Sequence, residues 1–244
     1  MREDLEDAYG AIDWARTHLP PLQHAFQAWF DSPPYLVVEE PHPEMRQKLF
    51  KLEINRRLPP SLNAGVGAVI NSVRSSLDLL AASLARRNGI MATADHHFPI
   101  YSSHQDFMEP LNEAKRKKWL SPRNLAIIEG LKPYAGGDDV LYAIHRLDVT
   151  RKHERLVRVN LTPRGAVVSP GALEQGFRMP AVWPRFQDGA VIGWTDINAT
   201  DCEFHISAEI TFDKTELLSG APILPTLYEF VGLADGIVQR FERT

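Results

Sequence analysis

One stretch constrains the fold of this 244-residue chain more than any other, the run from Asn63 to Gly89. Asn63 is a residue type that caps helix starts, and Gly89 can take the left-handed conformation that ends a helix. Between them, apolar side chains recur every three or four residues, which is the spacing of one face of an amphipathic helix. These side chains are Val66, Val69, Ile70, Val73, Leu77, Leu80 and Leu84. The sequence therefore predicts a long central helix over 63–88.

Length and composition limit the class of protein. A chain of this length with 44% hydrophobic residues can bury one sizeable core, and we expect a single domain over 1–244. The net charge of −4 gives no overall signature of nucleic-acid binding, so any contact with RNA would be local. A single cysteine, Cys202, excludes an internal disulfide and a multi-cysteine zinc site. Neither a signal peptide nor a run of roughly 20 apolar residues is present, so we expect a cytoplasmic protein with no membrane partner.

The segments around the central helix predict an α+β fold. An amphipathic helix over 2–31, with a kink or hairpin at Pro20-Pro21, precedes two neighbouring strands over 35–40 and 46–55. Further helices are predicted over 104–119, 122–131, 138–155 and 222–243, and further strands over 156–161, 166–169, 190–194 and 203–212. A turn at 163–165 separates the first two of these strands. We expect a helical layer around the long central helix, with its core at about 60–155, flanked by a C-terminal antiparallel sheet and a closing helix within about 156–244.

Polar residues beside the apolar face of the central helix have two interpretations. Asn71, Arg74 and Asp78 fall within about 60° of one another around the helix axis. One interpretation is an i, i+4 ion pair of Arg74 with Asp78 on a half-solvated flank, and another is a polar site shared with a second helix. On the 138–155 helix, Asp148 and Arg151 lie near the core side, so one of them should be partly buried. We expect Arg74 and Asp78 to be its partners.

Other polar runs favour ordinary structural roles. The basic run 115–118 near a helix end is expected to be a solvated face that complements the helix dipole. The adjacent His96 and His97 would point to opposite sides of an extended chain, so we predict no metal site and no cofactor. The phosphate-binding glycine loop, the His-Glu-x-x-His helix and the Gly-x-Ser-x-Gly elbow are all missing from the sequence. Standard motifs therefore do not decide whether the chain is an enzyme.

Four segments resemble a widespread family of uncharacterised bacterial and phage proteins: SVRSSLDLLAASL, HFPIYSS, IIEGLKPY and VLYAIHRLDVTRKHERL. That family carries an LRxALDHL helix, an FPI loop, an LQPY helix end and a DKHR-type helix, and the likeness covers about residues 65–160. The chain keeps the Arg and Asp of the first motif and the Lys-His of the last, as Arg74, Asp78, Lys152 and His153. Two family residues, a His and an Asp, are replaced by Leu79 and Arg151.

The last segment is also similar to HEPN helical domains, many of which are RNases with an Arg followed four to six residues later by a His. Arg146 and His153 stand at the limit of that spacing and project within about 20° of each other, on a face that the core does not need. The resemblance implies metal-free RNA cleavage in the cleft of a homodimer, with His153 acting on the 2′-hydroxyl and Arg146 stabilising phosphate charge. Two alternatives remain open: a non-catalytic interaction module that uses the same face, and a small-ligand binder whose pocket holds Asn71, Arg74, Asp78 and Asp148.

Overall fold

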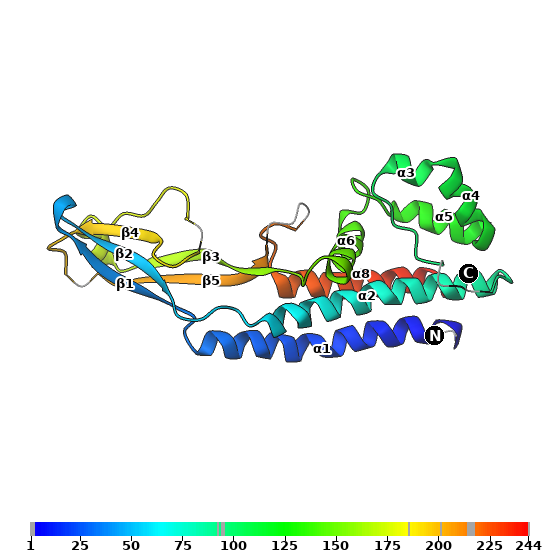
Figure 1. Ribbon diagram of the computed structural model, residues 1–244, viewed down its shortest axis with the longest axis horizontal. Helices are drawn as coiled ribbons and strands as arrows, with labels where there is room; N and C mark the ends of the chain where they lie inside the picture. Colours follow the sequence, from blue (N-terminus) through cyan, green and yellow to red (C-terminus); the bar gives the residue numbers. More distant parts are fainter. Residues whose placement is uncertain are drawn as a thin grey trace.

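The protein is elongated, with a helical bundle at one end of its long axis and β-strands at the other (Figure 1). The structure, a computed structural model, describes residues 3–91, 93, 96–184, 186–200, 202–213 and 218–243. Its α-helices are α1 (Glu6–Asp31), α2 (Pro60–Arg87), α3 (His104–Met108), α4 (Pro110–Trp119), α5 (Pro122–Leu131), α6 (Asp139–His153), α7 (Pro170–Glu174) and α8 (Ile223–Arg240). Its strands are β1 (Tyr35–His42), β2 (Gln47–Ile54), β3 (Val159–Val168), β4 (Val191–Asp196) and β5 (Phe204–Phe212). The predicted α+β class is confirmed.

Three helices, α1, α2 and α8, lie side by side along the long axis and form the bundle (Figure 1). Their apolar faces share one core, in which every apolar position predicted for the central helix is buried. Helix α2 begins at Pro60 rather than at the predicted cap Asn63, because proline suits the first turn and the apolar face extends back to the buried Leu62. Gly89 adopts the predicted left-handed conformation after the helix, with φ of 74°.

Helix α1 shows that the hairpin predicted at Pro20-Pro21 is wrong, because the helix is continuous from Glu6 to Asp31. Both prolines are exposed, so the carbonyl groups that lose an N–H partner can be hydrated. Leu19 before the prolines and Leu22 after them are buried in the same core. Burial of one continuous apolar face therefore outweighs the local effect of the prolines.

Helix α6 packs against α2, and the shorter helices α3, α4 and α5 form a layer above the C-terminal half of α2 (Figure 1). The helix predicted over 104–119 is divided into α3 and α4, because Pro110 disfavours the helical conformation at Glu109. Asp138 caps α6, with its Oδ1 accepting the N–H of Leu141 at 2.9 Å. These short elements build the surface on which the candidate site lies.

The strands form two antiparallel sheets in the described part of the chain, where the C-terminal strands were predicted to form one. Strands β1 and β2 are neighbours, as predicted, but β4 joins them, while β3 pairs with β5. The turn predicted at 163–165 is a bulge within β3, at which Arg164 has no partner in the register with β5. Pro163 lies next to it, and proline is tolerated at bulges because the ladder is disrupted there. Phe204, Ile206, Ile210 and Phe212 of β5 are buried, but alternation along a strand does not identify the partner strand.

The sheets have a hydrophobic cluster of their own, which is continuous with the bundle through β5. Phe204 and Ile206 belong to the cluster of the sheets, whereas Ile210 and Phe212 belong to the core of the bundle. The bundle core also takes in both terminal helices, so it extends beyond the 60–155 range predicted for it. Among the described residues, no helix combines the length and the apolar character needed to span a bilayer.

Candidate functional site

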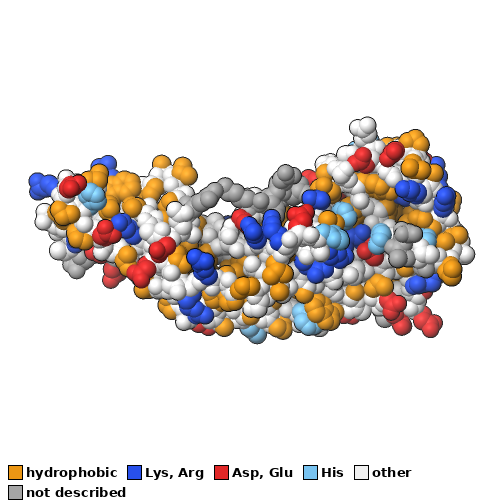
Figure 2. Space-filling view, viewed as in Figure 1, with side chains coloured by type: hydrophobic (Ala, Val, Ile, Leu, Met, Phe, Trp, Pro, Cys, Tyr) orange, Lys and Arg blue, Asp and Glu red, His pale blue; other side chains and the backbone are white. Residues whose placement is uncertain are grey.

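A cleft of about 450 Å³ lies where α2, α4, α6 and the loop before α3 meet. This volume falls within the range of small-ligand sites, about 300–1,000 Å³. Histidine, lysine and arginine side chains gather on this part of the surface, over α6 and next to the layer of α3, α4 and α5 (Figure 2). The ionisable side chains that line the cleft, apart from a tyrosine, are Arg74, Asp78, His97, Lys115, Arg116, His145, Asp148, Lys152 and His153.

Arg74 and Asp78 form the i, i+4 ion pair, with 2.5 Å between Nη1 and Oδ1. Arg74 is only 5% exposed, so the pair is more buried than a half-solvated flank. The pair also holds the backbone of Phe98, whose N–H donates to Asp78 Oδ1 at 2.8 Å and whose carbonyl accepts from Arg74 Nη2 at 3.2 Å. The Phe98 ring is buried in the bundle core. Arg74 and Asp78 therefore fix the loop that carries His97 to the cleft.

Asp148 is buried, as expected for one residue on the core side of α6, but its partners differ from the prediction. Its carboxylate lies 2.6 Å from Lys152 Nζ and 3.3 Å from Arg151 Nη2, both on its own helix. No hydrogen bond or ion pair joins it to Arg74 or Asp78 among the described residues. The reason is that Phe98 uses the polar groups of Arg74 and Asp78, whereas Lys152 and Arg151 lie within one turn of Asp148.

Arg151 and Asn71 supply a polar link between α6 and α2. Arg151 Nη2 donates a hydrogen bond to Asn71 Oδ1 at 2.5 Å. The side chain of Arg151 passes close to Gly67, where a Cβ atom would lie 2.7 Å from Arg151 Cδ. The glycine therefore leaves room for this link, and Asn71 serves packing of the two helices rather than the lining of the cleft.

Helix α4 carries two cations into the cleft. Arg116 is 2% exposed, so the prediction that the 115–118 run is entirely solvated is wrong at this position. Its Nη2 donates to the Phe107 carbonyl at 2.8 Å, and the Phe107 and Tyr101 rings lie 4.1 and 5.3 Å from its guanidinium carbon. Its Nε and Nη1 are buried without a hydrogen-bond partner in the described part of the chain. Lys115 beside it is exposed.

The three histidines of the cleft are in different environments. His97 and His153 are exposed, and His97 Nδ1 lies 3.5 Å from Asp78 Oδ1. His145 is partly buried, and this burial, followed by the positive charges of Arg74 and Arg146, lowers the pKa of its ring to about 4. At neutral pH His145 is therefore uncharged, and His97 and His153 are the histidines that a ligand can reach directly.

The structure brings five of the residues predicted for a site together in the lining of this cleft: Arg74, Asp78, Asp148, Lys152 and His153. Arg146 is exposed on α6 but lies outside the lining, and Asn71 is bonded to Arg151. Four further lining residues, each a histidine, lysine or arginine, were not predicted as site residues: His97, Lys115, Arg116 and His145. The spacing of Arg116, three residues before the apolar Trp119, could have identified it, since both lie on one face of the helix.

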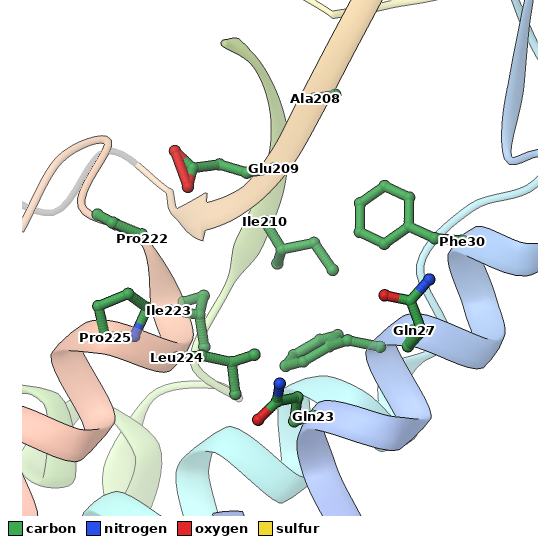
Figure 3. Close-up of a pocket in the computed structure, with 11 residues that line it drawn as sticks. Gln23, Gln27, Phe30, Ala208, Glu209, Ile210, Pro222, Ile223, Leu224 and Pro225 are labelled. Carbon is green, nitrogen blue, oxygen red and sulfur yellow. The ribbon is translucent and has the colours of Figure 1, made fainter. Parts of the chain in front are cut away.

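A smaller cavity of about 200 Å³ lies between α1, β5 and the start of α8 (Figure 3). Its wall is mostly apolar, with Gln23 and Gln27 of α1 as its neutral polar side chains. Glu209 lies at its edge and forms an ion pair with Arg164. Figure 3 shows the Glu209 carboxylate turned away from both glutamines. This cavity brings no group of ionisable side chains together among the described residues, whereas the cleft between α2, α4 and α6 does.

The cleft combines side chains that can exchange protons with side chains that can hold negative charge. In the described ranges, no group of three or more His, Cys, Asp or Glu side chains is arranged to hold a metal ion. Comparison of the chain with protein-family models, curated proteins and solved structures found no match, so the function proposed below rests on the cleft itself.

Proposed function

We propose that the protein binds single-stranded RNA in the cleft and cleaves it without a metal ion. The observation that carries this proposal is that two exposed histidines, His97 and His153, line one cleft together with Lys115, Arg116 and Lys152. Cleavage of RNA through its own 2′-hydroxyl needs a base, an acid and positive charge near the phosphate. Histidine can serve as either the base or the acid near neutral pH.

In the proposed reaction, His153 removes the proton of the 2′-hydroxyl, and the 2′-oxygen attacks the neighbouring phosphorus. His97 protonates the 5′-oxygen as its bond to phosphorus breaks, which leaves a 2′,3′-cyclic phosphate and a 5′-hydroxyl end. Asp78, 3.5 Å from His97 Nδ1, is suited to orient that ring. The excess positive charge of the cleft stabilises the negative charge that builds up on the phosphate oxygens.

Arg146 takes a different part from the one implied by the HEPN resemblance. It is exposed on α6 and lies outside the lining of the cleft, so we propose that it contacts a phosphate next to the one that is cut. His97 and His153 belong to one chain, and the proposal therefore does not depend on a homodimer.

The test is incubation of purified protein with labelled single-stranded RNAs of varied sequence in the presence of EDTA. We expect products with 2′,3′-cyclic phosphate ends, and no cutting of DNA of the same sequence, because DNA lacks the attacking hydroxyl. His153→Ala and His97→Ala should each lower the rate by about 10²–10⁴-fold, the range for a general acid or base. Their melting temperatures should stay close to that of wild type, since both side chains are exposed.

His205→Ala is the matched control, because His205 is exposed on β5 and lies outside the cleft. This variant should cut RNA at the wild-type rate. Equal inactivity of wild type and His153→Ala toward all the RNAs would exclude cleavage. An interaction module without chemistry would then be the better account of the exposed face of α6.

A further inference from the structure

The charges of the cleft are not balanced along the wall formed by α4. Two of its cations are paired with its two carboxylates, Arg74 with Asp78 and Lys152 with Asp148. Lys115 and Arg116 have no carboxylate within ion-pair distance among the residues that the structure describes. The nearest acidic residue along the helix, Glu113, is paired with Lys117, and the charge of Arg116 acts on its carboxylate more weakly than that of Lys117. The α4 wall therefore offers two cations to whatever occupies the cleft.

Arg116 is held in place by contacts that do not cancel its charge. The rings of Phe107 and Tyr101 lie near its guanidinium, and one of its nitrogens donates to a backbone carbonyl. Its other two nitrogens are buried with no described partner. A buried cation with unpaired donors is unfavourable unless an opposite charge compensates it. An anion bound in the cleft would supply that compensation.

We propose that the α4 wall of the cleft binds a phosphate monoester, with Lys115 and Arg116 as its charge partners. A phosphate monoester carries about −1.5 to −2 charges at pH 7, which matches two uncompensated cations better than the single charge of an internal phosphodiester. Lys115 is exposed and contacts the anion directly, while Arg116 contributes positive charge from inside the wall. This inference rests on the proposed function, because it names a terminal phosphate as the part of the RNA that the cleft holds.

Aromatic side chains in the same lining favour a nucleotide over free phosphate. Tyr101 and Trp119 line the cleft together with the two cations. Bases stack on aromatic side chains with little dependence on sequence, and each stacked base contributes about 1–3 kcal/mol. AMP should therefore bind more tightly than inorganic phosphate, and adenosine, which lacks the phosphate, should bind more weakly than AMP.

The experiment measures binding of inorganic phosphate, adenosine and AMP by calorimetry, and of short 2′-O-methyl RNAs by fluorescence anisotropy. The 2′-O-methyl group blocks the cleavage reaction, so binding is measured alone. Three oligomers of one sequence carry a phosphate at the 5′ end, at the 3′ end or at neither end. Either the 5′-phosphorylated or the 3′-phosphorylated oligomer should bind about tenfold more tightly than the unphosphorylated one. A tenfold difference in affinity is the effect expected for one charge-assisted hydrogen bond.

Lys115→Gln should remove this preference for a phosphorylated end. The variant should fold normally because Lys115 is exposed, whereas replacement of the buried Arg116 would disturb the wall itself. Lys118→Gln is the matched control, since Lys118 is exposed on the same helix and does not line the cleft. It should keep the full preference.

The outcomes separate this inference from the proposed function. Equal affinity for the three oligomers overturns the inference, even when RNA is cut as proposed. The inference is also overturned if Lys115→Gln binds AMP or phosphorylated RNA as tightly as wild type does. Lys115-dependent binding of AMP by a protein that cuts no RNA supports the phosphate site and excludes the cleavage reaction.

Discussion

The cleft has two walls, one formed by α2 and α6 and the other formed by α4. They differ in whether their charged side chains have oppositely charged partners in the chain, and we call the first the paired wall. On the first, Arg74 and Asp148 each have an oppositely charged partner in the chain. On the second, Lys115 and Arg116 have none among the described residues. Charges that are paired within the chain stabilise the fold, and charges without such a partner are available to a ligand. The predictions below test whether the two walls separate stability from binding in this way.

The largest effect on stability is expected at Arg74, on the paired wall. Arg74→Ala would remove the partner of Asp78 and the donor to the Phe98 carbonyl. Loss of one member of a buried pair costs about 3–5 kcal/mol, and we expect roughly 3 kcal/mol in the free energy of unfolding because Asp78 is partly exposed. Urea denaturation followed by circular dichroism measures this change.

The control for Arg74 is an arginine in an exposed ion pair. Arg16 contacts Asp13 and Asp235 at the surface, and its side chain is 47% exposed. Arg16→Ala should lower the unfolding free energy by less than about 1 kcal/mol. Equal losses for the two variants would mean that burial of Arg74 and its contact with Phe98 add nothing to stability.

A smaller loss is expected from the link between α2 and α6. Asn71→Ala would remove the acceptor for Arg151 Nη2. A hydrogen bond to a charged group contributes about 1.5–3 kcal/mol, and the better helix propensity of alanine offsets part of its loss, so we expect a decrease of about 1 kcal/mol. Gln27→Ala removes an exposed hydrogen bond to Asp31 within α1 and should leave the same urea midpoint almost unchanged.

The fold was predictable from the sequence where local chemistry and burial agree. The apolar spacing of α2 and the left-handed conformation of Gly89 each depend on a few neighbouring residues, and the structure has both. The predictions failed where distant contacts decide. Burial of Leu19 and Leu22 in one core keeps α1 continuous past its prolines. The partner of β4 depends on a register that alternation cannot specify.

The candidate site was predictable only in part, for a related reason. The i, i+4 spacing of Arg74 and Asp78 indicated their ion pair, because both residues lie on one helix. Their second partner, the backbone of Phe98, belongs to a loop without periodicity, so no sequence pattern indicated it. In the run 115–118, Arg116 is buried whereas the three lysines are exposed. In the sequence, Arg116 differs from them in lying three residues before Trp119, on the same face of the helix.

The smallest predicted effect concerns His145, which lies on α6 and so belongs to the paired wall. Its burial and the positive charges of Arg74 and Arg146 lower its pKa from 6.5 to about 4, although the negative charges of Asp78 and Asp148 act in the opposite direction. As the pH falls through 6.5, the unfolded chain takes up a proton at this histidine, while the folded protein does not until the pH is near 4. The contribution of neutral His145 to stability is therefore complete above pH 6.5 and is lost between about 6.5 and 4.

Thermal melts at pH 7.5 and pH 5 would show this loss as a difference between variants. Acidification should lower the melting temperature of wild type more than that of His145→Gln, because glutamine takes up no proton in either state. His205→Gln should behave as wild type, since His205 is exposed on β5. An equal loss in wild type and His145→Gln would mean that water or the carboxylates of Asp78 and Asp148 compensate the ring on protonation. The carboxylates of the paired wall would then neutralise its cations more fully than the low pKa of His145 implies. The paired wall would differ even more from the α4 wall, where Lys115 and Arg116 have no carboxylate partner among the described residues.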